Sequence, residues 1–65
     1  MLIPFNDAES GRTVFVNPKH VAVVFEGKNP EGIQLTMINL LNGNIATDQD
    51  FLTVVGMIQG ELKHD

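Results

Sequence analysis

The stretch TMINLLNGNIATDQDF, residues 36–51, carries the two signals that decide the fold. Asn42-Gly43 separates two apolar-rich runs, and Thr47-Asp48 stands immediately before a helical pattern. Asn and Gly adopt positive φ at low cost, and a type I′ hairpin turn requires positive φ at both central positions. We therefore predict a type I′ turn at Asn42-Gly43, followed by a short return strand over 44–47. The predicted pairs are Leu41 with Asn44, Leu40 with Ile45 and Ile38 with Thr47.

A helix is predicted to follow the return strand directly, over residues 48–62. The side-chain oxygen of Thr47 or Asp48 can cap it by accepting from free N–H groups of the first turn, and Asp50 adds negative charge where the helix dipole favours it. Gly60 is predicted to fray or end the helix. Apolar residues recur at helical spacing and form one stripe, which comprises Phe51, Val54, Val55, Ile58 and Leu62.

Four further strands are predicted upstream, over residues 2–5, 12–17, 20–26 and 33–41. Pro4 is tolerated in the first because an edge position need not donate to a ladder. Turn formers separate the strands at 6–11 and 27–32, and Asn17-Pro18 predicts a turn or bulge because proline has no N–H and restricts the residue before it. The sequence thus predicts a single α+β domain over 1–65, an antiparallel β-meander of four to five strands with one C-terminal amphipathic helix.

The longest predicted strand, 33–41, is apolar on both of its faces. A meander that is exposed on one side alternates cleanly between apolar and polar residues, and this strand does not. One face lies under the helix, so we predict that the other face is covered as well. The two faces are Ile33, Leu35, Met37, Asn39 and Leu41, and Gln34, Thr36, Ile38 and Leu40.

The chain is too short to build a large core of its own. Its 65 residues allow one domain, and a chain of this size buries only about 60% of its unfolded surface. Small domains compensate with disulfides, a metal or self-association. There is no cysteine, and His20 and His64 lie far apart in the sequence. Self-association into a dimer or larger assembly is therefore predicted.

A second candidate interface lies on the predicted helix. Gly56 and Gly60 form a ridge of small residues on the side away from the apolar stripe, with Leu52 and Met57 beside it. Each interior glycine costs about 0.5–1 kcal/mol relative to alanine. The ridge is either part of an ordinary frayed terminal helix or a place where a helix or strand of a second copy approaches closely. The full candidate interface is Ile33, Leu35, Met37, Leu41, Leu52, Gly56, Met57 and Gly60.

The charge distribution excludes some classes of partner. The formal net charge is −4, from eight acidic and four basic residues, without a basic cluster. Nucleic-acid binding needs several Lys or Arg side chains against phosphates, so no nucleic-acid partner is predicted. No apolar run approaches the roughly 18 residues of a membrane span, and the first residues lack the pattern of a signal peptide. We predict a cytoplasmic protein with no membrane span.

No pattern in the chain predicts catalysis. Ser10 lies in a predicted turn, and His20 is either a proton carrier or, more simply, a turn histidine. Asp48 and Asp50 are spaced like acidic ligands, but helix capping explains them, and a calcium loop needs more oxygens and a closing Glu. The glycines are scattered among turns and form no phosphate-binding cluster. No catalytic residue, metal ligand or cofactor is predicted, so the chain is not expected to be an enzyme.

The pattern resembles the small flagellar-operon proteins of the FlbD/SwrD swarming-motility type. The matching letters extend over 14–58 and comprise Asn17-Pro18, Val21, Val24, Thr36-x-Ile38-x-Leu40-x-Asn42-Gly43, and Val54 or Val55 with Ile58. The resemblance implies a non-catalytic, self-associating accessory of flagellar motility, with a motor protein as its further partner. Acidic, cysteine-free proteins of this size are also typical of bacteriophages. The alternative is therefore a phage-encoded inhibitor of a host protein, or a sponge for a small ligand held at an oligomer interface.

Overall fold

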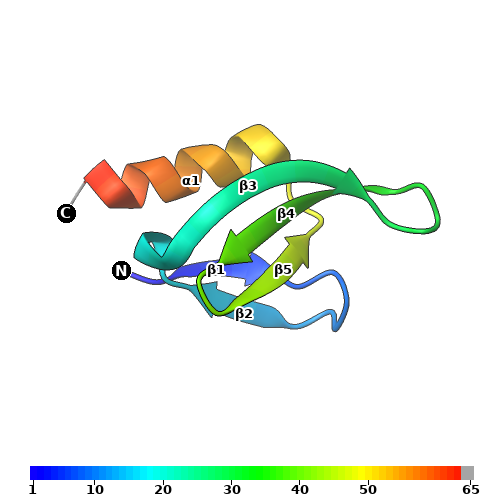
Figure 1. Cartoon of the computed structure of the whole chain (residues 1–65), viewed down its shortest axis with the longest axis horizontal. Helices are drawn as coiled ribbons and strands as arrows, with labels where there is room; N and C mark the ends of the chain where they lie inside the picture. Colours follow the sequence, from blue (N-terminus) through cyan, green and yellow to red (C-terminus); the bar gives the residue numbers. More distant parts are fainter. Residues whose placement is uncertain (64–65) are drawn as a thin grey trace.

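A computed structural model of the chain describes residues 1–63. Within them the elements are β1 (Ile3–Asn6), β2 (Thr13–Val16), the short 3-10 helix η1 (Pro18–His20), β3 (Val21–Lys28), β4 (Gln34–Leu40), β5 (Gly43–Thr47) and α1 (Phe51–Lys63). Neighbouring strands pair antiparallel, and the one helix follows the last strand (Figure 1). The predicted α+β class, with a β-meander and a C-terminal helix, is confirmed.

The strands divide into two sheets rather than one continuous meander. β1 pairs with β2 as a hairpin, and the meander consists of β3, β4 and β5 in that order. The division falls at Asn17-Pro18. Pro18 begins η1 and is buried, and Asn17 Oδ1 accepts the Lys19 N–H at 3.0 Å. Because proline has no N–H for a ladder, the chain leaves the hairpin here.

Pro4 lies with its nitrogen on the unpaired edge of β1. It stands opposite Phe15 in the hairpin. The N–H of Asn6 points away from β2 and donates to Gln49 Oε1 at 3.4 Å. Backbone groups of alternate strand residues point to the same edge, so the nitrogen of Pro4 points the same way as that of Asn6. The missing N–H therefore removes no ladder bond.

A bulge at Ala22 decides which side chains of β3 face the core. The register between β3 and β4 shifts between Val21 and Val23. The extra residue lets both Val21 and Val24 pack against the core, whereas Val23 faces outward and is 51% exposed. A bulge of this kind inserts one unpaired residue and turns the following side chains to the opposite face.

The core lies where the hairpin, the meander and α1 meet. In the described part of the chain its buried apolar members are Ile3, Phe5, Val16, Ile38, Val54 and Ile58. The hairpin and the helix thus cover the same face of the meander. Two members of the predicted helix stripe, Val54 and Ile58, are buried, and Phe51 and Val55 are half-buried beside them.

The turn between β4 and β5 is formed by Leu41-Asn42, one residue earlier than predicted. Leu40 pairs with Gly43, so the predicted register is wrong by two residues. Among residues 1–63, positive φ occurs only at two glycines in other loops, so the predicted type I′ turn at Asn42-Gly43 is also wrong. The N–H of Leu41 donates to the carbonyl oxygen of His20 at 3.0 Å, which ties this turn to η1.

Packing explains the observed register. It pairs the fully buried Ile38 with Ile45, and the buried Thr36 with the buried Thr47. The predicted register instead places Thr47 opposite Ile38, and it leaves Ile45 outside the central row. Tertiary burial therefore outweighs the turn preference of Asn-Gly, whose effect is local.

Helix α1 begins at Phe51 and is capped by Asp50. The N–H of Thr53 donates to Asp50 Oδ2 at 3.2 Å, and the N–H of Val54 donates to the Asp50 carbonyl oxygen at 2.9 Å. The side-chain bond satisfies a donor that the first turn of a helix otherwise leaves free, and the carbonyl bond is the first backbone bond of the helix. Asp50 thus acts as the cap itself rather than as an added charge inside the helix.

The prediction that Thr47 or Asp48 caps the helix is wrong. Thr47 is the last residue of β5 and is fully buried, and its Oγ1 accepts the Gln49 N–H at 3.3 Å, which orders the bend before the helix. Asp48 is exposed. Gly60 lies inside α1 and does not end it. Thr47, Asp48 and Asp50 are all of residue types that cap helices. The packing of the bend places Asp50, rather than the other two, at the start of the helix.

Candidate functional site

The outer face of the meander is open, and we call its apolar part the sheet surface. The hairpin and α1 lie on the other side of the meander (Figure 1). Phe25, Met37 and Ala46 form one row across the three strands. Asn39 and Asn44 pair with each other in the next row of the same face. Val23 is 51% exposed and Phe25 is 43% exposed, which is high for apolar side chains inside strands. The sheet surface is defined by Val23, Phe25, Leu35, Met37 and Ala46.

A glycine shapes this surface at its β3 edge. Gly27 lies opposite Leu35 in the β3–β4 pairing. A Cβ added at Gly27 would lie 3.1 Å from Cγ of Met37, which is closer than side chains normally approach. The side chain of Met37 therefore lies across the backbone of β3, in the space that a side chain at Gly27 would occupy. This position keeps Met37 half-buried and the surface shallow.

Two loops rise at the rim of the sheet surface and enclose a hollow of about 280 Å³. The β1–β2 loop is held against β5, because the N–H of Ala8 donates to the Ala46 carbonyl oxygen at 2.7 Å. The β3–β4 loop is held by Asn29, whose Oδ1 accepts the N–H groups of Glu31 at 3.0 Å and of Ile33 at 2.9 Å. The hollow is lined by Ala8, Glu9, Lys28, Asn29, Pro30, Leu35, Met37 and Ala46.

The predicted interface residues of 33–41 are distributed along this face. Leu35 and Met37 are half-buried on the sheet surface, and Ile33 lies just before β4 with 54% of its surface exposed. Leu41 lies in the turn at the opposite end of β4 and is 74% exposed. The structure thus brings Leu35 and Met37 together with the hollow and places Leu41 apart from it.

Sequence reasoning missed Val23, Phe25 and Ala46, which complete the sheet surface. Simple alternation places Val21 on the same face as Val23, and the bulge at Ala22 breaks that relation. The letters VAVVF at 21–25 place valine both two and three residues after Val21, so the sequence gives no signal for the bulge.

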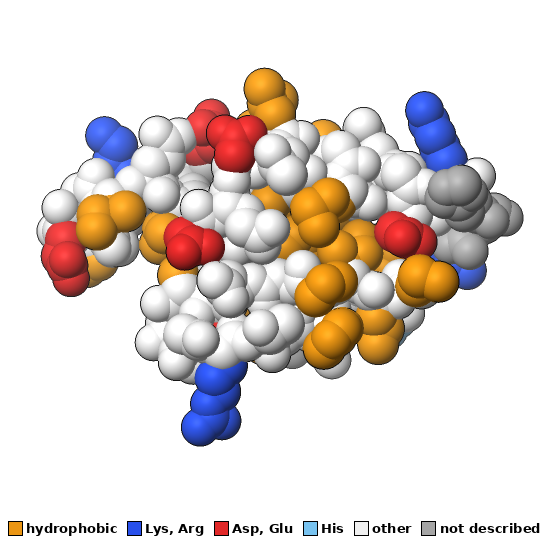
Figure 2. Space-filling model, turned by 180° about the vertical axis from the view of Figure 1, so that it is seen from behind, with side chains coloured by type: hydrophobic (Ala, Val, Ile, Leu, Met, Phe, Trp, Pro, Cys, Tyr) orange, Lys and Arg blue, Asp and Glu red, His pale blue; other side chains and the backbone are white. Residues whose placement is uncertain are grey.

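The other predicted interface residues lie on the opposite side of the molecule, along what we call the helix groove. Hydrophobic side chains gather there over α1 and the N-terminal strand (Figure 2). The groove has a volume of about 410 Å³ and is lined by Met1, Leu2, Ile3, Pro4, Gly56, Met57, Gly60 and Glu61. No neighbouring atom lies within 4 Å of a Cβ built at Gly56 or Gly60, so the glycine ridge faces open space. Leu52 is exposed near the start of the helix and is not part of the groove.

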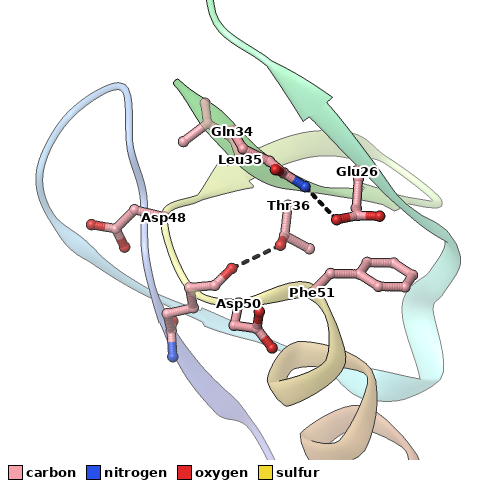
Figure 3. Close-up of a pocket in the computed structure, with 8 residues that line it drawn as sticks. Glu26, Gln34, Leu35, Thr36, Asp48, Asp50 and Phe51 are labelled. Atoms are coloured by element: carbon pink, nitrogen blue, oxygen red, sulfur yellow. Dashed lines mark hydrogen bonds between the residues drawn. The ribbon is translucent and has the colours of Figure 1, made fainter. Parts of the chain in front are cut away.

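A polar pocket lies where β4 meets the start of α1 (Figure 3). Thr36 Oγ1 donates to the Gln49 carbonyl oxygen at 2.7 Å, which anchors the bend to β4. Gln34 Nε2 donates to the carboxylate of Glu26 across the β3–β4 pair. The pocket has a volume of about 300 Å³ and is lined by Glu26, Gln34, Leu35, Thr36, Asp48, Gln49, Asp50 and Phe51. These bonds give the pocket a structural role in fixing the helix start.

Of the residues considered for chemistry, Ser10 has a structural role and His20 lies at the surface. Ser10 Oγ donates to Asp7 Oδ2 at 2.8 Å and accepts the Arg12 N–H at 3.2 Å, so it holds the β1–β2 loop. His20 is exposed at the end of η1, and His64 lies outside the described residues. Over residues 1–63, no cluster of three or more His, Asp or Glu side chains could hold a metal ion. Nor is any helix in that range long and apolar enough to cross a membrane.

Comparisons of the chain with protein-family models, with curated proteins and with solved structures find no match. The resemblance to the FlbD/SwrD type therefore stays a prediction.

Proposed function

We propose that the chain is a non-catalytic interaction protein that self-associates through the sheet surface. The supporting observation is a largely apolar face of a regular sheet, on which Val23 and Phe25 are about half exposed and Leu35 and Met37 line the hollow. Apolar patches of this kind on small proteins mark interaction sites. Another copy of the same chain is a binding partner that is always present in solution.

The small size of the core supports the same proposal. The hydrophobic core comprises six buried residues within residues 1–63, and the sequence contains no cysteine for a disulfide. Each apolar side chain that is removed from water contributes about 1.5–3 kcal/mol. Burying the sheet surface against a second copy therefore adds stability that the single chain lacks, and closed two-fold dimers are the commonest way to do so.

The charge distribution also suits a contact between identical copies. Two molecules with a formal net charge of −4 each repel one another. The residues that define the sheet surface carry no charge, so the contact places no pair of like charges at its centre. Acidic side chains such as Asp48 and Asp50 lie by the polar pocket at the helix start.

For the biological setting, two candidates are proposed from the sequence and the hollow. The FlbD/SwrD-type resemblance supports a role as a cytoplasmic accessory of flagellar motility, in which the self-associated form binds a motor protein. The hollow on the sheet surface supports a second candidate, a phage-encoded inhibitor or sponge that holds a small ligand where two copies meet. Native mass spectrometry of protein purified from its own host separates these two, because a retained small mass favours the sponge and a retained protein favours the accessory.

Sedimentation equilibrium at micromolar concentration tests the self-association itself, with two matched variants. Phe25→Glu places a charge in the middle of the sheet surface and is expected to yield a monomer. Phe15→Glu makes the same change on the outer face of the hairpin, where Phe15 is also exposed, and is expected to leave the assembly intact. A wild-type chain that sediments only at 7.1 kDa overturns the proposal.

A further inference from the structure

The turn between β4 and β5 contains the one asparagine of the sequence that is followed by glycine. Leu41-Asn42 forms the reversal of the chain, and Asn42 and Gly43 are both exposed. Within residues 1–63, the side chain of Asn42 makes no hydrogen bond. Nothing in the described part of the chain therefore holds the Asn42 side-chain amide away from the backbone nitrogen that follows it.

An asparagine side chain can react with the backbone nitrogen of the next residue. The Gly43 nitrogen, after it loses its proton to the solvent, attacks Cγ of Asn42. A C–N bond forms, the bond from Cγ to Nδ2 breaks, and the leaving nitrogen takes up protons and departs as ammonia. Water then opens the five-membered succinimide ring at either carbonyl carbon, which yields aspartate or isoaspartate. Water is the one co-reactant, and no group is oxidised or reduced.

The surroundings of Gly43 favour this attack. Gly43 has no side chain to obstruct its nitrogen, and a Cβ built there meets no neighbouring atom within 4 Å. Gly43 pairs with Leu40 in the last pair of the β4–β5 ladder, so its backbone must leave that pair before it reacts. Pairs at the end of a ladder open locally at a much lower free energy than global unfolding requires. The reaction is therefore accessible to the folded chain.

The other asparagines of the chain lie in positions that disfavour the reaction. Asn17 and Asn29 each precede a proline, which has no N–H to lose, and their Oδ1 atoms accept backbone N–H groups. Asn39 and Asn44 lie inside strands, and each precedes a bulky apolar residue that crowds the nitrogen. Asn6 lies in β1 and precedes an aspartate. The combination of exposure, a turn and a following glycine thus occurs at Asn42.

We propose that Asn42 is a site of spontaneous deamidation in the folded protein, which converts it to aspartate or isoaspartate. Either product adds a negative charge to a chain whose formal net charge is −4. Isoaspartate also carries the main chain through its side-chain carbon, so it lengthens the turn by one methylene group. This lengthening disturbs the pair of Leu40 with Gly43 and the bond from the Leu41 N–H to the His20 carbonyl oxygen.

Incubation of the purified protein at mildly alkaline pH, followed by peptide mapping with mass spectrometry, tests the proposal. Conversion is expected at Asn42 and not at the other asparagines, and it is expected to be faster at higher pH because the attacking nitrogen is deprotonated. Enzymatic methylation of the isoaspartyl carboxylate identifies that product. Gly43→Val places a β-branched side chain beside the nitrogen, where the backbone has no positive φ. This variant is expected to lose detectable conversion over the same period.

A second variant separates local opening from global unfolding. Gly60→Ala stabilises α1 and leaves the turn unchanged. If the reaction required global unfolding, this variant would slow it roughly two- to fivefold, whereas local opening leaves its rate as in the wild type. An intact Asn42, conversion that is spread over several asparagines, or slower conversion in Gly60→Ala overturns the proposal.

Discussion

The sheet surface and the helix groove are both open and apolar, yet they are built in different ways. The sheet surface is a row of side chains on a paired backbone, with Phe25 and Met37 in register. The helix groove is lined by the N-terminal segment and by Gly56 and Gly60, which present no side chain. Exposed apolar area alone therefore does not identify an interface. The regular row of apolar side chains distinguishes the sheet surface from the groove.

The core beneath both surfaces is the point at which a single change has the largest effect. Ile58 is buried on the inner side of the helix whose outer side lines the groove. Ile58→Ala is expected to cost about 2–5 kcal/mol, because it leaves a cavity in a small core. Gln59→Ala, one residue along on the exposed side, is expected to change the stability very little. Thermal denaturation of both variants is the measurement, and equal losses would contradict the packing of α1.

A substitution in the β3–β4 loop, beside the sheet surface, is expected to have a smaller effect on stability. Gly32 has φ of 83° in the β3–β4 loop, and its Cβ position is open, so strain is the only obstacle to a side chain there. Gly32→Val is expected to cost about 1–3 kcal/mol because a β-branched residue rarely adopts positive φ. Gly43→Val, at the start of β5 without positive φ, is expected to be nearly neutral. If urea unfolding shows that Gly43→Val loses more stability than Gly32→Val, Gly43 has positive φ in solution and the type I′ turn at Asn42-Gly43 is correct.

A substitution in the helix groove is expected to have the smallest effect on stability, and it distinguishes between the two surfaces. Gly60→Ala adds a methyl group inside α1 where no neighbouring atom lies within 4 Å. The variant is expected to gain about 0.5–1 kcal/mol, since alanine restricts the unfolded chain and favours the helix. Its self-association is expected to match the wild type. Weaker association on sedimentation would mean that a second copy approaches the glycine ridge closely, and the comparison of the two surfaces would be reversed.

Local signals in the sequence predicted the elements but not their registration. The stripe of Val54 and Ile58 and the strand breaks at Asn17-Pro18 and 27–32 depend on neighbouring residues, and they predicted the helix and the strands. The β4–β5 register depends on burying Ile38 against Ile45, which lies beyond the reach of a turn preference. The turn assignment at Asn42-Gly43 failed for that reason.

The same distinction applies to the candidate site. Leu35 and Met37 were predicted because a strand that is apolar on both faces is expected to be buried on both. Glu9 was not, because its position at the edge of β5 depends on a hydrogen bond between Ala8 and Ala46, far apart in the sequence. Long-range contacts that dock one loop on another element leave no periodic trace in a single sequence.

A dilution series followed by amide chemical shifts distinguishes the two surfaces most directly. The shifts of a self-associating protein change with concentration at the residues that enter and leave the contact. We expect concentration-dependent shifts at 23–28 and 34–39, with Phe25 and Met37 among the largest, and nearly constant shifts at 56–61. Changes confined to the helix groove, or no change at any residue, would contradict self-association through the sheet surface.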